Sequence, residues 1–225
     1  MRPPLPPVVI SFGCPRSGTT FICALLVMGE GYSYGLLDET RLMHPVNSPI
    51  GLLELATIFR TQRVIFVRAV RHPLEIAESC CFLRREGGEG EGGPTTYAGR
   101  QTDQQIVTII RKEYDGFAGQ AAKVLSAGAK LQYPPVIIQA RLEEFAVQPH
   151  PMFAGLLPLL PDNEANAALP TIAAERYGTV PSRWGRLKAN AGAVMTTEQR
   201  AWFADKLGDV ITAQGYTVST TGDTA

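Results

Sequence analysis

Two glycines five positions apart follow a short apolar run near the start of the chain. The run Val8 to Phe12 is rich in β-branched and aromatic residues and indicates a buried strand, and the apolar stretch from Phe21 to Met28 favours a helix. Gly13 and Gly18, which lie between them, have the spacing of a phosphate-binding loop, G-x-x-x-x-G-K-[ST]. In such a loop, backbone N–H groups and the positive end of a helix dipole meet an anion. The segment predicts an anion site, although both glycines would also serve a plain strand-to-helix turn.

The residue after the second glycine argues against a nucleotide hydrolase. Thr19 occupies the position at which the ATPase loop carries its lysine, the residue that reaches the β- and γ-phosphates. A positive side chain does occur inside the loop, at Arg16. The loop therefore keeps a cation for its anion, but not at the position that ATP hydrolysis requires.

A second arginine and a serine follow the next apolar strand. The run Val64 to Val67 leads into Arg68-Ala69-Val70-Arg71, Pro73 suits the first position of a helix, and Ser79 lies less than two turns inside that helix. The carboxyl end of a parallel strand is where open α/β sheets place their ligands. An arginine fork and a hydroxyl could hold one phosphate between them, while the alternative is an arginine paired with nearby carboxylates and a serine buried in the helix.

The string Pro15-Arg16-Ser17-Gly18-Thr19-Thr20-Phe21 resembles the loop with which the sulfotransferase family holds the 5'-phosphosulfate of 3'-phosphoadenosine 5'-phosphosulfate (PAPS). The resemblance implies that Arg16 steadies the charge on the bridging oxygen as the bond to sulfur breaks. Arg71 and Ser79 likewise match the arginine and serine, eight residues apart, that bind the 3'-phosphate of PAPS in that family. The implied donor-binding residues are Arg16, Ser17, Gly18, Thr19, Thr20, Arg71 and Ser79.

A third region of resemblance lies before the last predicted helix. Residues 176–188 are similar to the family pattern G-x-x-G-x-W-[KR], with Trp184 as its tryptophan, but the interval from Gly178 to Trp184 is one residue longer than in the cytosolic enzymes. The basic residue that would reach the 3'-phosphate is therefore left open among Arg176, Arg183, Arg186 and Lys188. The resemblance extends from Val8 to Tyr216, and the segments 29–49 and 86–132 match nothing specific.

Sulfuryl transfer also needs a base that removes the proton of the acceptor. Relatives use a histidine or a glutamate outside the donor motifs, and we expect Glu39 in this role, with His44 as the second candidate. The alternative for each is an exposed loop residue. No cluster of Asp, His and Cys has metal-ligand spacing, so we expect no metal.

Strands and helices alternate along the chain. We expect strands at 8–12, 63–68 and 135–140 and irregular stretches at 29–49, 86–100 and 161–188, with helices at 21–28, 51–60, 73–85, 104–127, 152–160 and 197–214. This order predicts an α/β fold, namely a three-layer α/β/α domain with a central parallel sheet of the P-loop NTPase-like type. We expect one domain over residues 1–225.

Composition limits the partners. The 21 basic and 21 acidic residues give no net charge, so nothing draws the whole chain to nucleic acid or to an anionic membrane. No apolar run is long enough for a membrane span, and four cysteines without C-x-x-C spacing favour reduced thiols in the cytoplasm. Nothing in the sequence indicates the oligomeric state.

Together these features predict an enzyme, a PAPS-dependent sulfotransferase that modifies a hydroxyl or amine of a small-molecule or glycan acceptor. The alternatives are a P-loop kinase-like phosphotransferase and a relative that binds the nucleotide without catalysis. The sequence does not identify the acceptor.

Overall fold

The computed structural model describes residues 7–14, 16–26, 56, 61–86, 101–146, 149–176 and 194–218. The chain divides into two compact units. Unit 1 comprises residues 1–70 and 117–180, and unit 2 comprises residues 71–116 and 181–225. The predicted single domain over 1–225 stays a prediction.

Unit 1 contains a three-stranded parallel sheet. The strands are β1 (Val8–Gly13), β2 (Val64–Val70) and β3 (Val136–Arg141), and β2 pairs with both of the others. Every residue of β1 and β2 is buried, as expected for parallel strands that are covered on both faces. The pairing places Val8 beside Val64 and Gly13 beside Ala69, so the two strands end at the same edge.

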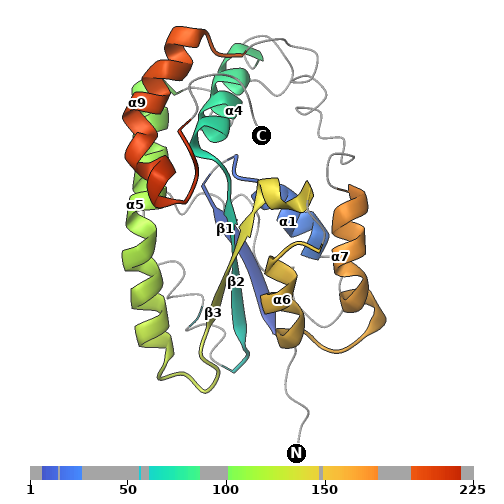
Figure 1. Ribbon diagram of the computed structural model, residues 1–225. Coiled ribbons are helices and arrows are strands. Elements are labelled where there is room, and N and C mark those ends of the chain that lie inside the picture. Colours follow the sequence, from blue (N-terminus) through green and yellow to red (C-terminus); the bar gives the residue numbers. More distant parts are fainter. Residues whose placement is uncertain are drawn as a thin grey trace, which may run out of the picture. The chain divides into compact units, whose positions relative to one another are not determined.

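Helices cover both faces of this sheet (Figure 1). One face packs against α1 (Thr19–Leu26), α6 (Met152–Leu156) and α7 (Glu164–Arg176). The other face packs against the second half of α5 (Asp103–Gly128). The strand side chains alternate between the two cores. Val9, Ile65, Val67, Ala69 and Ala140 face α1, α6 and α7, and Val8, Ile10, Phe12, Val64 and Phe66 face α5. The predicted α/β class with a parallel sheet is confirmed.

Unit 2 contains three helices among its described residues: α4 (Pro73–Glu86), the first half of α5 and α9 (Thr197–Ala213). Their apolar sides are buried, at Leu74, Ile76, Ala77, Phe82, Ile106, Val107, Ile110, Tyr114, Phe203, Leu207, Val210 and Ile211. Both α5 and α9 begin with a capping box, which Thr102 forms with Gln105 and Thr196 with Gln199.

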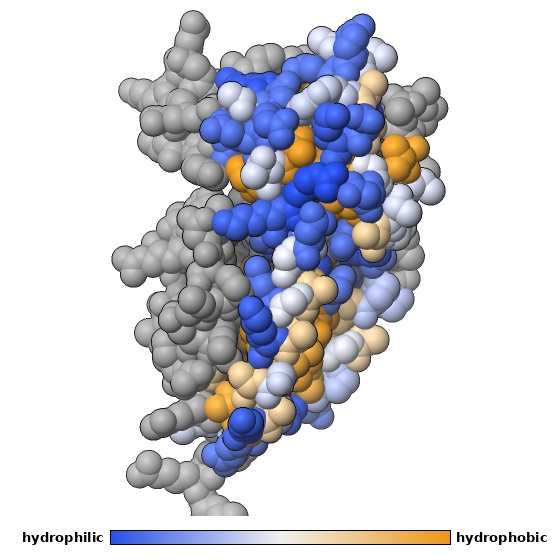
Figure 2. Space-filling view, turned by 90° about the vertical axis from the view of Figure 1, so that its left-hand side faces the viewer, coloured by the Kyte–Doolittle hydropathy of each residue, from blue (hydrophilic) through white to orange (hydrophobic). Residues whose placement is uncertain are grey.

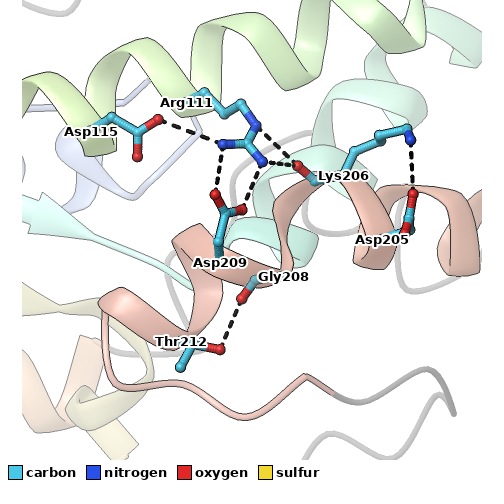
Figure 3. Close-up of polar contacts among 7 residues, drawn as sticks. All are labelled: Arg111, Asp115, Asp205, Lys206, Gly208, Asp209 and Thr212. Carbon is cyan, nitrogen blue, oxygen red and sulfur yellow. Dashed lines mark hydrogen bonds and ion pairs between the residues drawn. The ribbon is translucent and has the colours of Figure 1, made fainter.

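A bidentate ion pair joins α5 to α9 within unit 2 (Figure 3). The guanidinium of Arg111 donates to both carboxylate oxygens of Asp209, at 2.9 and 2.7 Å, and also to the backbone carbonyl of Lys206. This pairing raises the pKa of Arg111 and lowers that of Asp209. Because 67% of the Asp209 side chain is exposed, the pair adds little to stability, while its fork geometry sets the register of the two helices.

One predicted irregular stretch is helical. We expected no regular structure over 161–188, but α7 occupies Glu164–Arg176 with Pro170 in its interior. A proline in that position removes a backbone donor and normally ends a helix. Burial outweighs the unfavourable effect of Pro170, because Leu169 and Ala173 of α7 are completely buried in the core of unit 1.

The remaining predicted strands and helices agree with the structure within two residues, except that the predicted helix over 152–160 comprises α6 and the 3-10 helix η3 (Leu157–Leu159). The predicted irregular stretch over 29–49 lies outside the described residues, as does that over 86–100 except for Glu86, the last residue of α4. A 3-10 turn, η2 (Leu142–Ala146), also follows β3. The predicted helix over 51–60 lies outside the described residues except for Ala56, which is helical and buried. Figure 2, viewed from the side of α5, shows hydrophilic and apolar side chains intermixed over the coloured surface. No helix in the described ranges has the length and apolarity to cross a membrane.

Candidate functional site

The loop from Gly13 to Gly18 connects the end of β1 to the first turn of α1 in unit 1. The backbone N–H of Ser17 donates to the carbonyl of Cys14 at 3.0 Å, which closes a turn inside the loop. The first intrahelical bond runs from the N–H of Ile22 to the carbonyl of Gly18. The amides of the residues between them precede any intrahelical acceptor and can therefore meet a ligand.

Packing and backbone angles explain both glycines of the loop. A Cβ on Gly13 would lie 2.5 Å from the backbone oxygen of Ala69 in the neighbouring strand. At Gly18 the φ angle is +97°, a region that residues with a side chain rarely adopt. The predicted spacing of the glycines is therefore needed for the turn itself, whether or not an anion binds there.

Two other loop residues are not explained by packing. Arg16 has φ +72°, the left-handed region, and it is the one described residue other than glycine with positive φ. Ser17 is completely buried, and its Oγ has no hydrogen-bond partner among the described residues. Left-handed backbone at a residue other than glycine and a buried hydroxyl without a partner each cost free energy, and both are concentrated at functional sites.

The start of α1 is tied to β1. The hydroxyl of Ser11 donates to the backbone oxygen of Thr19 at 3.4 Å, and the Thr19 side chain is buried. Thr20, another predicted hydroxyl ligand, is the second residue of α1, and its side chain lies outside the described part of the chain. The predicted loop residues 16–20 thus lie together at the mouth of one helix, with Pro15 not described.

Arg71 and Ser79 belong to unit 2. Arg71 Nη2 pairs with Glu75 Oε2 at 3.2 Å, and Pro73 is the first residue of α4, as predicted. Glu75 and Ser79 are four residues apart and therefore share one face of α4. The guanidinium of Arg71 consequently lies over the first turn of the face that carries Ser79, which is buried.

One hydroxyl group bonds both the N–H and the carbonyl of Arg71. Tyr114 Oη donates to the carbonyl of Arg71 at 2.7 Å and accepts from its N–H at 3.2 Å. Sequence reasoning missed this residue, although Tyr114 continues the apolar stripe of Ile106 and Ile110 at intervals of four along α5. A tyrosine in such a stripe signals a buried polar contact, because the hydroxyl needs a partner.

A second missed residue is the buried Arg68 of β2. Its guanidinium carbon lies 3.5 Å from the ring centroid of Phe117, and the residue is 1% exposed. An arginine inside an otherwise apolar strand is the sequence signal that points to such a contact. Arg68 therefore has a structural cation–π role on the α5 side of the sheet.

Two histidines cap helices. His72 Nδ1 accepts the N–H of Leu74 at the start of α4, and its ring lies against that of Tyr216. His150 Nδ1 accepts the N–H of Met152 at the start of α6, and its Nε2 donates to the carbonyl of Arg141 at 2.9 Å. Burial lowers the pKa of His150, which is therefore neutral near pH 7.

The predicted bases Glu39 and His44, and the tryptophan of the third motif, Trp184, lie outside the described residues. Within the described ranges, no group of three or more His, Cys, Asp and Glu residues could hold a metal ion. The described cysteines Cys14, Cys80 and Cys81 are buried thiols, and burial raises the pKa of Cys81 to about 11.

The loop and the Arg71–Ser79 pair belong to different units, so their predicted meeting at one ligand stays a prediction. Comparison with known proteins adds no family: no family model, no curated protein and no solved structure matches this chain.

Proposed function

We propose that this protein is a P-loop-like sulfotransferase of the cytoplasm that takes the sulfuryl group from PAPS. The observation that carries the proposal is the loop between β1 and α1. It combines the left-handed Arg16 with the buried, unpartnered hydroxyl of Ser17 at the amino end of a helix. An anion at this position would gain a guanidinium, helix N–H groups and the positive end of the dipole, and would give these two costly features a purpose.

Only some of the loop N–H groups are available to this anion. The N–H of Ser17 is taken by Cys14, so the 5'-phosphosulfate would be met by N–H groups of Gly18, Thr19 and Thr20. Arg16 would approach from the loop side. This set contains four donors or positive groups and no carboxylate, which suits a dianionic ligand without a metal.

In unit 2, Arg71 and Ser79 supply the second half of the proposed ligand site. The 3'-phosphate would replace the Glu75 carboxylate as the partner of the Arg71 guanidinium, because a doubly charged group competes well against a partly exposed ion pair. Tyr114 holds the backbone of Arg71 in place for this exchange. A nucleotide without a 3'-phosphate would leave the Arg71–Glu75 pair intact.

The proposed reaction is an in-line displacement at sulfur. The acceptor oxygen or nitrogen forms a bond to sulfur while the bond from sulfur to the bridging oxygen breaks, and that oxygen leaves with 3',5'-adenosine bisphosphate. Arg16 and the loop amides stabilise the charge that develops on the leaving oxygen. The acceptor proton passes to a base, for which Glu39 and then His44 are our candidates.

Selective stabilisation by nucleotides tests the donor half of the proposal. Thermal-shift titrations with 3',5'-adenosine bisphosphate, ADP and GDP should show a rise in Tm with the bisphosphate that the other two do not match. Arg71→Ala should remove this selectivity, and Arg16→Ala should lower turnover more than donor affinity. Arg63→Ala, at the opposite end of β2 and exposed, is the matched control and should bind normally.

The competing functions give different results in the same titration. A P-loop kinase-like phosphotransferase would favour ADP or GDP, and a relative that has lost catalysis would bind the bisphosphate without releasing it from PAPS in the presence of any acceptor. Equal affinity of Arg71→Ala and the wild type for the bisphosphate would refute the 3'-phosphate assignment.

A further inference from the structure

Three packed aromatic rings support the first turn of α1 in unit 1. The ring of Phe21, the third residue of α1, meets that of Phe145 edge to face, with the ring centroids 5.0 Å apart. The ring of Phe145 in η2 stacks in turn on that of His150, with 3.9 Å between the centroids and 24° between the planes. Phe145 and His150 are each only 1% exposed. Neither ring can therefore meet a ligand itself, and any effect that they have on binding passes through α1.

Hydrogen bonds fix the orientation of the His150 ring. Its Nε2 donates to the carbonyl of Arg141, the last residue of β3, at 2.9 Å, and its Nδ1 accepts the N–H of Met152, the first residue of α6, at 3.0 Å. Because both ring nitrogens are engaged, the ring cannot turn without losing a bond. Burial lowers the pKa of His150, so the ring is neutral near pH 7 and Nδ1 stays an acceptor. The imidazole therefore presents one fixed face to Phe145.

The segment that carries Phe145 also contacts the anion loop directly. Leu142, the first residue of η2, occupies the space beside Gly18, because a Cβ on Gly18 would lie 2.7 Å from Leu142 Cδ1. η2 thus contacts the chain on both sides of Thr19 and Thr20, at Gly18 before them and at Phe21 after them. The N–H groups that would meet the phosphosulfate belong to this same short segment. In a close-packed interior, a change in η2 is transmitted to it.

We propose that His150 and Phe145 are positioning residues for the anion loop, which fix the first turn of α1 so that its N–H groups point at the phosphosulfate. This inference rests on the proposed PAPS site and assigns the His150 ring a role beyond capping α6. Donors that are already in place cost the ligand no ordering free energy, so a looser turn binds the anion more weakly.

The same substitution in the two cores of unit 1 tests the proposal. Phe145→Leu is the test and Phe66→Leu the matched control, since Phe66 is equally buried but faces α5. Both variants should lose Tm by similar amounts. Hydrogen exchange of the Ile22 amide, which donates to the carbonyl of Gly18 at 3.1 Å, reports the first turn of α1 without any nucleotide. Protection of this amide and affinity for 3',5'-adenosine bisphosphate should each be about fivefold lower in Phe145→Leu than in Phe66→Leu.

Two substitutions of His150 separate its ring from its hydrogen bonds. In His150→Asn the side-chain oxygen can still accept the N–H of Met152, but no ring faces Phe145. In His150→Phe the ring is kept and both hydrogen bonds are lost. Each variant should have a lower Tm, because each loses at least one buried hydrogen bond. Only His150→Asn should lower the protection of Ile22 and the affinity for the bisphosphate, and His150→Phe should keep both near the wild-type values.

Equal protection of Ile22 in Phe145→Leu and Phe66→Leu, or in the two His150 variants, would overturn the positioning role. Lower protection in Phe145→Leu with unchanged affinity for the bisphosphate would overturn it as well, because the turn would then be loosened without consequence for the ligand. A wild-type protein that does not bind the bisphosphate would refute the PAPS proposal instead. Exchange of the Ile22 amide would in that case still decide whether the His150 and Phe145 rings fix the first turn of α1.

Discussion

Replacing Arg16 with glycine should stabilise the protein. Its φ of +72° costs a residue with a Cβ about 1–2 kcal/mol, which glycine does not pay. Glycine is also more flexible in the unfolded chain, and this lowers the gain in folding free energy by about 0.4–1 kcal/mol. The net expectation is about 0.5–1 kcal/mol, or a rise in Tm of about 2 °C for a chain of this size.

The same substitution should weaken donor binding if Arg16 meets the phosphosulfate. A hydrogen bond to a charged group contributes about 1.5–3 kcal/mol, so affinity for PAPS should fall by a factor of about 10 to 150. A more stable Arg16→Gly variant that binds PAPS more weakly would show that Arg16 serves ligand binding and destabilises the fold.

Urea unfolding and calorimetric titration of the same preparations measure both effects. Arg63→Gly is the matched control, because Arg63 is exposed and is not among the described residues with positive φ. Glycine at that position should destabilise by about 0.5–1 kcal/mol and leave donor binding unchanged. Destabilisation of Arg16→Gly as large as that of Arg63→Gly would refute the strain at residue 16, and donor binding as tight as in the wild type would refute its contact with the phosphosulfate.

Four further substitutions test packing and charge at other positions. Gly13→Ala should destabilise by about 3 kcal/mol because the new Cβ would meet the backbone of β2, whereas Gly119→Ala, at an open site within α5, should stabilise by about 0.5–1 kcal/mol in urea unfolding. Asp209→Asn should cost about 0.2–1 kcal/mol at low salt through the lost pair with Arg111, and less at 1 M NaCl. In the wild type, His150 stays neutral when folded but takes up a proton when unfolded, so stability should fall as pH drops below about 6.5. His150→Asn should flatten this part of the pH profile of urea unfolding.

The strands and the order of the elements were predictable because their signals are local. β1 and β2 are largely apolar runs, and a helix is the next element after each of them. Pro73 marks the first residue of α4, and Gly215, with φ +76°, ends α9 as its C-terminal glycine. Each of these boundaries depends on the conformation of a few neighbouring residues.

Contacts between distant segments had no such local signal. Arg111 and Asp209 are 98 residues apart, and either could equally have been a solvated surface charge. α7 was missed for a related reason, because the local effect of Pro170 is unfavourable while the burial that outweighs it depends on the sheet. The open surface pocket lined by residues of α4, α5 and α9 likewise forms only when these helices pack together.

In the loop from Gly13 to Gly18, the glycines and the two polar residues differ in what they indicate about function. The glycines gave the first sequence signal, yet Gly13 is required by the backbone of β2 and Gly18 by its own φ angle, so they would be needed in a turn without any ligand. Arg16 and Ser17 differ, because left-handed backbone at a residue with a Cβ and a buried hydroxyl without a partner each cost free energy. Substitutions of Arg16 and Ser17 therefore discriminate between an anion-binding loop and a plain connection better than substitutions of the two glycines.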